Sequence, residues 1–267
     1  MLRLISLVPS ITETLYALGF GAEVVGVTEQ CDYPEDARIK EKIGTFAQPD
    51  RSRILALKPD LVLGDGALHQ AVLEKLRRMD VNVLAFQPKG VEEILSNMQM
   101  IGRFSRREPA VDGIVEAYRL RINEMRRESW RERPRVLRIM TTEPYIIPGL
   151  GSYQYDALQI AGAKLMPIQS EEAYVKVRWE EIVAFDPEVI LFCGVESHAT
   201  RPRRCKGCTA KLPICQRTVE DIVNEKWLQL SAVRENRIFP LACETICRPG
   251  PRLIEGMERL NQIFCTL

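Results

Sequence analysis

Two stretches of similar layout, "SRILALKPDLVLGDG" (52–66) and "EEIVAFDPEVILFCG" (180–194), decide the fold. Each predicts a helix, a turn at a proline followed by an acid, an apolar strand and then a glycine. Alternation of helices with buried strands is typical of parallel α/β sheets. Because the same layout occurs in both halves of the chain, we expect two similar α/β lobes.

The beginning of the chain continues this pattern. Residues 3–8 predict a buried strand, and residues 11–19 predict a helix that Gly19 ends. Ser10 and Glu13 have the S-x-x-E spacing of a capping box, so we expect Ser10 to cap this helix.

A long polar stretch, residues 108–132, separates the two halves. Its apolar positions recur at helical spacing, which predicts one long amphipathic helix. They are Ile114, Val115, Tyr118, Ile122 and Met125. The predicted organisation is an N-terminal lobe (1–107), a linking helix (108–133) and a C-terminal lobe (134–267). A joint of this kind leaves a cleft, and clefts between domains are the usual ligand sites.

Composition excludes several classes of protein. The 267 residues carry a formal net charge of +1, which argues against nucleic acid as a partner. No apolar run approaches the roughly 18 residues needed to span a bilayer. The start "MLRLISLVPSITE" lacks the pattern of a signal peptide. We therefore predict a cytoplasmic protein; the alternative is a periplasmic or cell-surface protein whose leader was removed.

Several longer stretches resemble a known family. They are "ISLVPSITETLYALGFGAEVVGVTEQCDYPEDA", "IGTFAQPDRSRILALKPDLVLG", "DPEVILFCG" and "NRIFPLACETICRPGPRLIEGMERL". Together they resemble the helix-linked (class III) substrate-binding proteins of ABC importers, and most of all the cobalamin-binding (vitamin B12) branch. The resemblance covers nearly the whole chain except roughly residues 195–217. It implies two Rossmann-like α/β lobes with parallel sheets, joined by one long α-helix, with the ligand cleft between them.

The resemblance also implies ligand-binding residues on the loops that face the cleft. They are Pro9, Ser10, Ile11, Phe46, Asp65, Glu244 and Arg248. At Asp65 the branch has a cleft-lining aromatic residue, which this chain lacks. Two of these residues have a purely structural alternative: Phe46 could pack in the core, and Ser10 could only cap its helix.

Partnership with a transporter is less well supported by the sequence. The family docks on its permease through one glutamate at the tip of each lobe. The matching helix start in the first lobe reads Leu68-His69-Gln70, without an acid, and in the second lobe Glu196 is the candidate. We expect a small-molecule ligand as partner, and the missing acid weakens the prediction of an ABC importer permease. His69 is expected to be a surface residue.

Cysteines gather in the segment that the resemblance leaves out. Cys205, Cys208 and Cys215 form a C-x2-C-x6-C series in a Cys-rich insertion (195–217), and Cys243 and Cys247 follow later. Thiolates at such spacing hold zinc or iron–sulfur clusters. One close pair with more distant cysteines favours a [4Fe–4S] cluster at the cleft mouth over zinc. Disulfides or free thiols remain the third alternative.

The remaining cysteines and His198 lie outside this series and are interpreted separately. Cys193 is either a core residue or a spare metal ligand, and His198 is an alternative fourth ligand. We expect Cys31 and Cys265 to be ordinary small apolar residues.

These observations favour a binding protein over an enzyme. With two histidines the chain is poorly supplied for acid–base chemistry, and "GFGAEVVG" follows a helix, unlike a phosphate loop. The leading hypothesis is a soluble binder of cobalamin or a related corrinoid that carries a Cys-ligated iron–sulfur cluster or other metal. The alternatives are a leaderless ABC importer component for cobalamin, haem or a ferric siderophore, and a redox-active corrinoid reductase.

Overall fold

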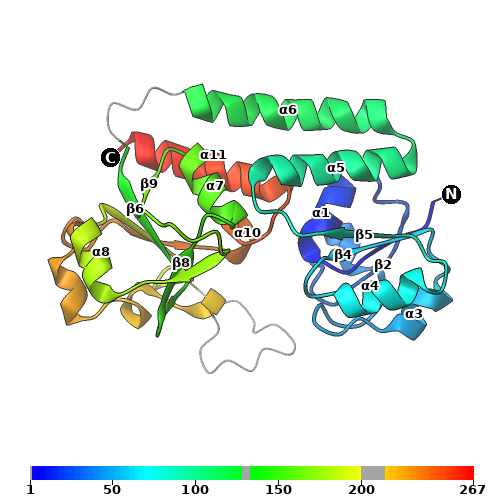
Figure 1. Cartoon of the computed structure of the whole chain (residues 1–267), viewed down its shortest axis with the longest axis horizontal. Coiled ribbons are helices and arrows are strands. Elements are labelled where there is room, and N and C mark those ends of the chain that lie inside the picture. The colour runs from blue at the N-terminus through cyan, green and yellow to red at the C-terminus, as the bar shows by residue number, and fades with distance from the viewer. Residues whose placement is uncertain (1, 128–132, 200–213) are drawn as a thin grey trace.

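The computed structural model describes residues 2–127, 133–199 and 214–267. Two α/β lobes lie side by side beneath long helices that run along the molecule (Figure 1). Within the described ranges, no helix combines the length and apolar character that crossing a bilayer requires.

The N-terminal lobe is built on one parallel five-stranded sheet with the order β3-β2-β1-β4-β5. Its strands are β1 (Leu4–Ser6), β2 (Val24–Val27), β3 (Glu41–Lys42), β4 (Leu61–Asp65) and β5 (Val83–Phe86). Its helices are α1 (Pro9–Ala17), α2 (Glu35–Arg38), α3 (Arg51–Ala56), α4 (Gln70–Arg77) and α5 (Val91–Ser105). Strands β1 and β4 lie at the centre and are apolar and buried, as strands covered on both faces require.

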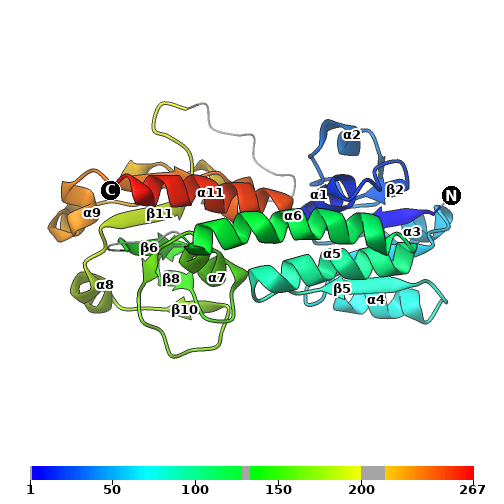
Figure 2. The ribbon, with the colours of Figure 1, turned by 90° about the horizontal axis from the view of Figure 1, so that it is seen from above.

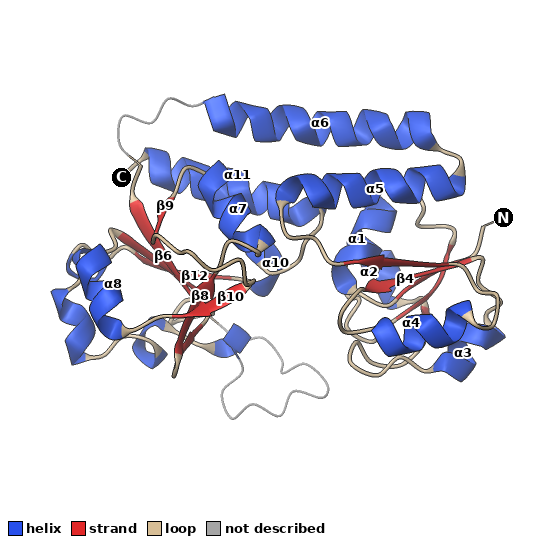
Figure 3. Ribbon diagram, in the orientation of Figure 1, coloured by secondary structure: helices blue, strands red, loops and turns tan. Residues whose placement is uncertain are grey.

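The C-terminal lobe contains a parallel four-stranded sheet, β12-β11-β6-β9, and a small antiparallel sheet, β10-β8-β7 (Figure 3). Its strands are β6 (Arg135–Ile139), β7 (Thr141–Thr142), β8 (Tyr145–Pro148), β9 (Lys164–Leu165), β10 (Tyr174–Lys176), β11 (Val189–Cys193) and β12 (Ile238–Leu241). Its helices are α7 (Tyr153–Ile160), α8 (Trp179–Phe185), α9 (Ser231–Arg234), α10 (Cys243–Ile246) and α11 (Pro251–Cys265). Short 3-10 helices are η1 (Ile214–Gln216), η2 (Val219–Asp221) and η3 (Glu225–Gln229). The prediction of two lobes with parallel sheets is confirmed, and the antiparallel sheet is an addition.

The two stretches that predict the fold have the same local structure. In the first, the Asp60 carboxylate accepts a hydrogen bond of 2.7 Å from the backbone N–H of Arg3, which precedes β1. In the second, the Glu188 carboxylate accepts one of 2.8 Å from the backbone N–H of Arg135, at the start of β6. In each lobe the acid after the proline therefore ties the turn to the neighbouring strand of the sheet.

The polar stretch between the lobes forms α6 (Glu108–Arg127), which runs beside α5 and along both lobes (Figure 2). Its buried side chains are Val111, Val115, Ile122 and Met125, while Ile114 and Tyr118 pack partly buried against the same core. The predicted amphipathic helix is confirmed up to Arg127, because residues 128–132 lie outside the described ranges.

One core cluster joins the two lobes to the long helices. It contains side chains from β4, α5, α6, β11 and α11, for example Leu61, Leu95, Val115, Leu191 and Leu253. A core shared in this way holds the lobes together, since separating them would expose apolar surface to water.

The predicted capping box at the start of α1 is wrong. The helix begins at Pro9, with Val8 at the N-cap and without any side-chain cap bond. Proline suits the first helical position because its missing N–H would have no partner there. Ser10 is therefore inside the helix, and the Glu13 carboxylate binds arginines elsewhere in the chain. Gly19 does follow the helix end with a positive φ of 79°, as predicted.

Candidate functional site

A cavity of about 480 Å³ lies where the two lobes face each other. The N-terminal lobe contributes Val8, Pro9, Ser10, Ile11, Thr14, Gln30, Phe46, Asp65, Phe86, Pro88, Ile94, Asn97 and Ile101. The C-terminal lobe contributes Tyr153, Tyr174, Cys247, Arg248 and Pro249. Many of the first group lie at or just beyond the carboxyl ends of the parallel strands. Open α/β sheets bind ligands at this edge, so the topology itself places a candidate site here.

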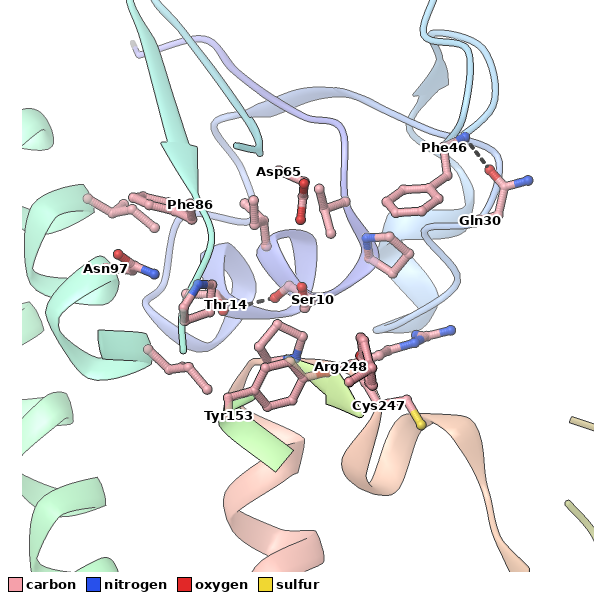
Figure 4. A pocket seen from close by; sticks show the side chains of 18 residues that line it. Ser10, Thr14, Gln30, Phe46, Asp65, Phe86, Asn97, Tyr153, Cys247 and Arg248 are labelled. Atoms are coloured by element: carbon pink, nitrogen blue, oxygen red, sulfur yellow. Dashed lines mark hydrogen bonds between the residues drawn. The ribbon is translucent and has the colours of Figure 1, made fainter. Parts of the chain in front are cut away.

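Aromatic side chains from both lobes line the cavity. Phe46 and Phe86 lie on the N-terminal side, and Tyr153 lies opposite, at the start of α7 (Figure 4). The Tyr153 hydroxyl donates a hydrogen bond of 2.7 Å to the backbone carbonyl of Cys247. Burial raises the pKa of Tyr153 well above its ordinary value, so this hydroxyl keeps its proton and its hydrogen bond. These side chains give the cavity an apolar, aromatic wall.

His69 holds two of the lining residues in place. Its Nδ1 accepts a hydrogen bond of 3.0 Å from the backbone N–H of Asp65, so in the neutral ring Nε2 carries the proton. Nε2 lies 2.7 Å from the carbonyl oxygen of Phe46, and the two rings meet edge to face at 5.4 Å. His69 is only 1% exposed, so the prediction of a surface histidine is wrong. A histidine four residues after a strand-ending acid gives no sequence signal for this role.

Polar groups surround the aromatic wall. Asp65 accepts backbone hydrogen bonds from Ala67 (2.9 Å) and Leu68 (2.7 Å) through one carboxylate oxygen. A carboxylate has about four acceptor sites, so Asp65 keeps capacity for a ligand donor. The Gln30 side-chain oxygen accepts from the backbone N–H of Phe46 at 2.7 Å, which fixes that loop. The cavity thus presents a carboxylate and side-chain amides beside its apolar surface.

Arg248 carries positive charge at the cavity edge, but its guanidinium is already paired. Nη1 lies 2.7 Å from Glu13 Oε1 and 2.8 Å from Asp32 Oδ1, both on the N-terminal lobe. The Glu13 carboxylate also accepts a hydrogen bond of 2.6 Å from Arg252. Burial alone would lower the pKa of Arg248, but Asp32 and Glu13 outweigh this effect and raise it. Arg248 therefore links the lobes, and two carboxylates of the N-terminal lobe balance its charge.

The structure brings together most of the ligand-binding residues predicted from the sequence. Those that line the cavity are Pro9, Ser10, Ile11, Phe46, Asp65 and Arg248. Glu244, on α10, is exposed and is not among the lining residues. Ligand contact by each of the seven stays a prediction.

The predicted metal ligands are only partly placed. Cys205 and Cys208 lie outside the described residues. Cys215 lies in η1, and Cys243 and Cys247 lie at the two ends of α10. Within the described ranges, no group of three or more His, Cys, Asp or Glu side chains is placed to hold a metal ion. Because Cys205 and Cys208 lie outside the described ranges, the [4Fe–4S] cluster and its set of ligands stay a prediction.

Cys193, for which the sequence allowed either a core position or a role as a spare metal ligand, lies next to Cys247. Its sulfur is 3.2 Å from that of Cys247, and it is buried at the end of β11. Cys31 is also buried, and it accepts a hydrogen bond of 3.0 Å from the Thr12 hydroxyl. Cys31 packs in the core, which fits the prediction of an ordinary small apolar residue, whereas Cys265 is exposed.

The chain is similar to known proteins along most of its length. Residues 4–242 match the model of a family described as periplasmic binding protein. The chain is 29% identical to the vitamin B12-binding protein of Yersinia pestis, over 92% of this chain and 85% of that protein. It is 27% identical to the uncharacterized ABC transporter substrate-binding lipoprotein YvrC of Bacillus subtilis, over 97% of this chain and 79% of that protein.

Solved structures share the fold. The periplasmic vitamin B12 binding protein BtuF of Vibrio cholerae superposes with a TM-score of 0.76 at 25% identity, over 99% of this chain and 96% of that one. The periplasmic heme binding protein HutB of Vibrio cholerae superposes with a TM-score of 0.79 at 16% identity, over 98% of both chains. At that lower identity the likeness to HutB shows the fold alone.

Proposed function

The chain belongs to the periplasmic binding protein family, and on this premise we propose that it binds a corrinoid of the vitamin B12 type between its lobes. The observation that carries the proposal is the cavity at the carboxyl ends of the N-terminal strands, closed by residues of the other lobe. Relatives that cover most of the chain are named vitamin B12-binding proteins, which supports this class of ligand.

The chemistry of the cavity favours a corrinoid over haem. Both ligands have a flat macrocycle that suits the wall formed by Phe46, Phe86 and Tyr153. A corrinoid carries amides at its edge, whereas haem carries carboxylates. Gln30, Asp65 and Asn97 can bind amides, but a carboxylate needs a free cation. Among the described lining residues, Arg248 is the one basic side chain, and Glu13 and Asp32 already bind it.

A competition titration tests this choice of ligand. Isothermal titration calorimetry of the full chain with cyanocobalamin is expected to give a Kd at least about tenfold lower than titration with haemin. Cobalamin already bound should also block the haemin signal. Tighter binding of haemin, or independent binding of both ligands, would contradict the corrinoid assignment.

The predicted iron–sulfur cluster is not required by this proposal. The described cysteines do not surround a metal site, and the cavity is formed without them except for Cys247. Iron and acid-labile sulfide analysis of protein purified without oxygen tests the cluster separately from ligand binding. A corrinoid reductase role would need such a centre, so we keep the function at binding.

We also propose that the protein acts as the substrate-binding component of an ABC importer, outside the cytoplasm. The names of the relatives, periplasmic proteins and a lipoprotein, support this location, and the cytoplasmic prediction gains no support from them. At the positions where the family docks on its permease, Leu68 and Glu196 are exposed and His69 is buried. Of these three residues, Glu196 is the one that carries the expected acid. Cell fractionation with an antibody to the protein checks the location: recovery in the cytoplasmic fraction alone would contradict it.

A further inference from the structure

Behind the cavity, two cysteines meet a buried arginine. Arg138 lies on β6 and is 2% exposed. Its Nη2 donates to the sulfur of Cys193 at 2.7 Å and to that of Cys247 at 3.5 Å. The two sulfurs are 3.2 Å apart. The Arg138 atoms Nε and Nη1 have no hydrogen-bond partner within the described ranges.

A buried guanidinium needs a negative charge beside it, because an unpaired buried charge is very costly. The groups that Arg138 contacts are thiols, so the pairing requires a thiolate. Because Arg138 Nη2 lies closer to the sulfur of Cys193 than to that of Cys247, we place the thiolate on Cys193, with the Cys247 thiol in contact with it.

We propose that Cys193 and Cys247 are a redox-active dithiol that closes to a disulfide on reaction with hydrogen peroxide. The sulfurs need to approach from 3.2 Å to the bond length of about 2.05 Å. Cys193 is buried at the end of a strand, which favours a small oxidant over a bulky disulfide. This inference does not depend on the identity of the ligand in the cavity.

The reaction has two steps. The Cys193 thiolate attacks one peroxide oxygen, which breaks the O–O bond and gives a sulfenic acid and hydroxide. Hydroxide takes the proton of Cys247 and becomes water. The Cys247 thiolate then attacks the sulfur of the sulfenic acid, forms the S–S bond and releases a second hydroxide. That hydroxide takes up the proton that Cys193 had lost, so two thiols and one peroxide give one disulfide and two waters.

The position of the pair connects it to the cavity wall. The Cys247 carbonyl accepts the Tyr153 hydrogen bond, and the next residue is Arg248, which links the lobes. The Cys247 sulfur itself points away from the cavity in Figure 4, toward the C-terminal lobe. The dithiol therefore lies behind the loop that lines the ligand cavity.

Peptide mapping of the full chain tests the proposal. Protein reduced with dithiothreitol is exposed to hydrogen peroxide, its free thiols are alkylated, and the digest is analysed by mass spectrometry. We expect a Cys193–Cys247 linked peptide that a second reduction removes, while buried Cys31 is recovered alkylated after unfolding. Cys193→Ser and Cys247→Ser should each abolish the link, and Cys265→Ser should leave it unchanged.

Arg138 provides a second readout. In Arg138→Leu we expect formation of the link to be at least about tenfold slower, because the thiolate loses its counter-charge, and in Arg138→Lys to be largely retained. Should Arg138→Leu not fold, the cysteine variants still decide. Linkage of Cys247 to a different cysteine, Cys193 remaining reduced, or a bound metal that is lost in Cys247→Ser would each overturn the proposal.

Discussion

The Glu13 carboxylate, on the first helix of the N-terminal lobe, lies 2.7 Å from the guanidinium of Arg248, 235 residues later in the chain. The Glu13 side chain is 2% exposed, so its carboxylate is almost fully removed from water. Arg252 binds the same carboxylate at 2.6 Å. These ion pairs connect the two lobes beside the cavity.

Removal of Arg248 is expected to destabilise the protein strongly. Arg248→Leu leaves Glu13 buried with one partner fewer, and breaking a buried pair in this way costs roughly 3–5 kcal/mol. Because Arg252 remains, we expect a loss of about 2–3 kcal/mol in the free energy of unfolding, measured by urea denaturation. The matched control is Arg53→Leu, whose partner Asp50 is exposed, and a surface pair contributes about 0–1 kcal/mol. Equal effects of the two variants would contradict the buried role of Glu13.

Replacement of His69 is expected to weaken ligand binding without touching the ligand. His69→Leu removes the hydrogen bonds to Asp65 and Phe46, each of which lines the cavity. Leaving buried polar groups unpaired costs about 1–3 kcal/mol, so the free energy of unfolding should fall by that amount. Cobalamin affinity, measured by calorimetry below the unfolding transition, should fall about tenfold.

The other histidine of the chain supplies the control. His198 is exposed and is not among the lining residues, so His198→Leu should change neither quantity. The positioning role of His69 is wrong if both histidine variants bind cobalamin as the unchanged protein does.

Asp32 should make stability depend on pH in the acid range. Burial would raise the pKa of Asp32, but the hydrogen bonds and charge of Arg248 outweigh it and lower that pKa. A carboxyl with a lowered folded pKa stabilises the fold above its unfolded pKa of about 3.9, and this stabilisation is lost as pH falls through the folded value. Urea denaturation from neutral pH downward should therefore show a smaller acid loss in Asp32→Asn. Parallel pH curves for the two proteins would refute the coupling.

Ser10 should contribute little to stability, since it does not cap α1. Ser10→Ala is expected to change the free energy of unfolding by less than about 0.5 kcal/mol. Asp50 does cap α3, by accepting from the backbone N–H groups of Ser52 (2.8 Å) and Arg53 (3.1 Å). Asp50→Ala should cost about 1 kcal/mol, the usual value for an N-cap. A larger loss for Ser10→Ala than for Asp50→Ala would restore the capping box predicted from the sequence.

The fold could be predicted because its signals are local and occur twice. The residues before the two prolines, Lys58 and Asp186, have nearly the same left-handed φ of 44° and 43°. The helix, turn, acid and strand around each proline were predicted from the sequence, and the structure confirms them. The small antiparallel sheet was missed because its strands, β7, β8 and β10, are two to four residues long. Strands so short carry little periodic pattern.

The site could be predicted only where the resemblance supplied it. Phe46 and Asp65 were expected at the cleft and do line the cavity. The roles of His69 and Arg138 depend on partners far along the chain, as in the bond from Arg138 to Cys193. Spacing within a sequence does not reveal such pairs, because they are brought together only by the tertiary fold.

The measurement that tests the central claim most directly is titration of the full chain with cyanocobalamin, compared with the same titration of Phe46→Ala. We predict saturable binding of one cobalamin per chain, with affinity at least about tenfold lower in Phe46→Ala, which loses an aromatic part of the wall. Leu228→Ala, an exposed apolar position that does not line the cavity, should bind as the unchanged protein does. Absence of saturable binding, or equal affinity in all three proteins, would contradict corrinoid binding in this cavity.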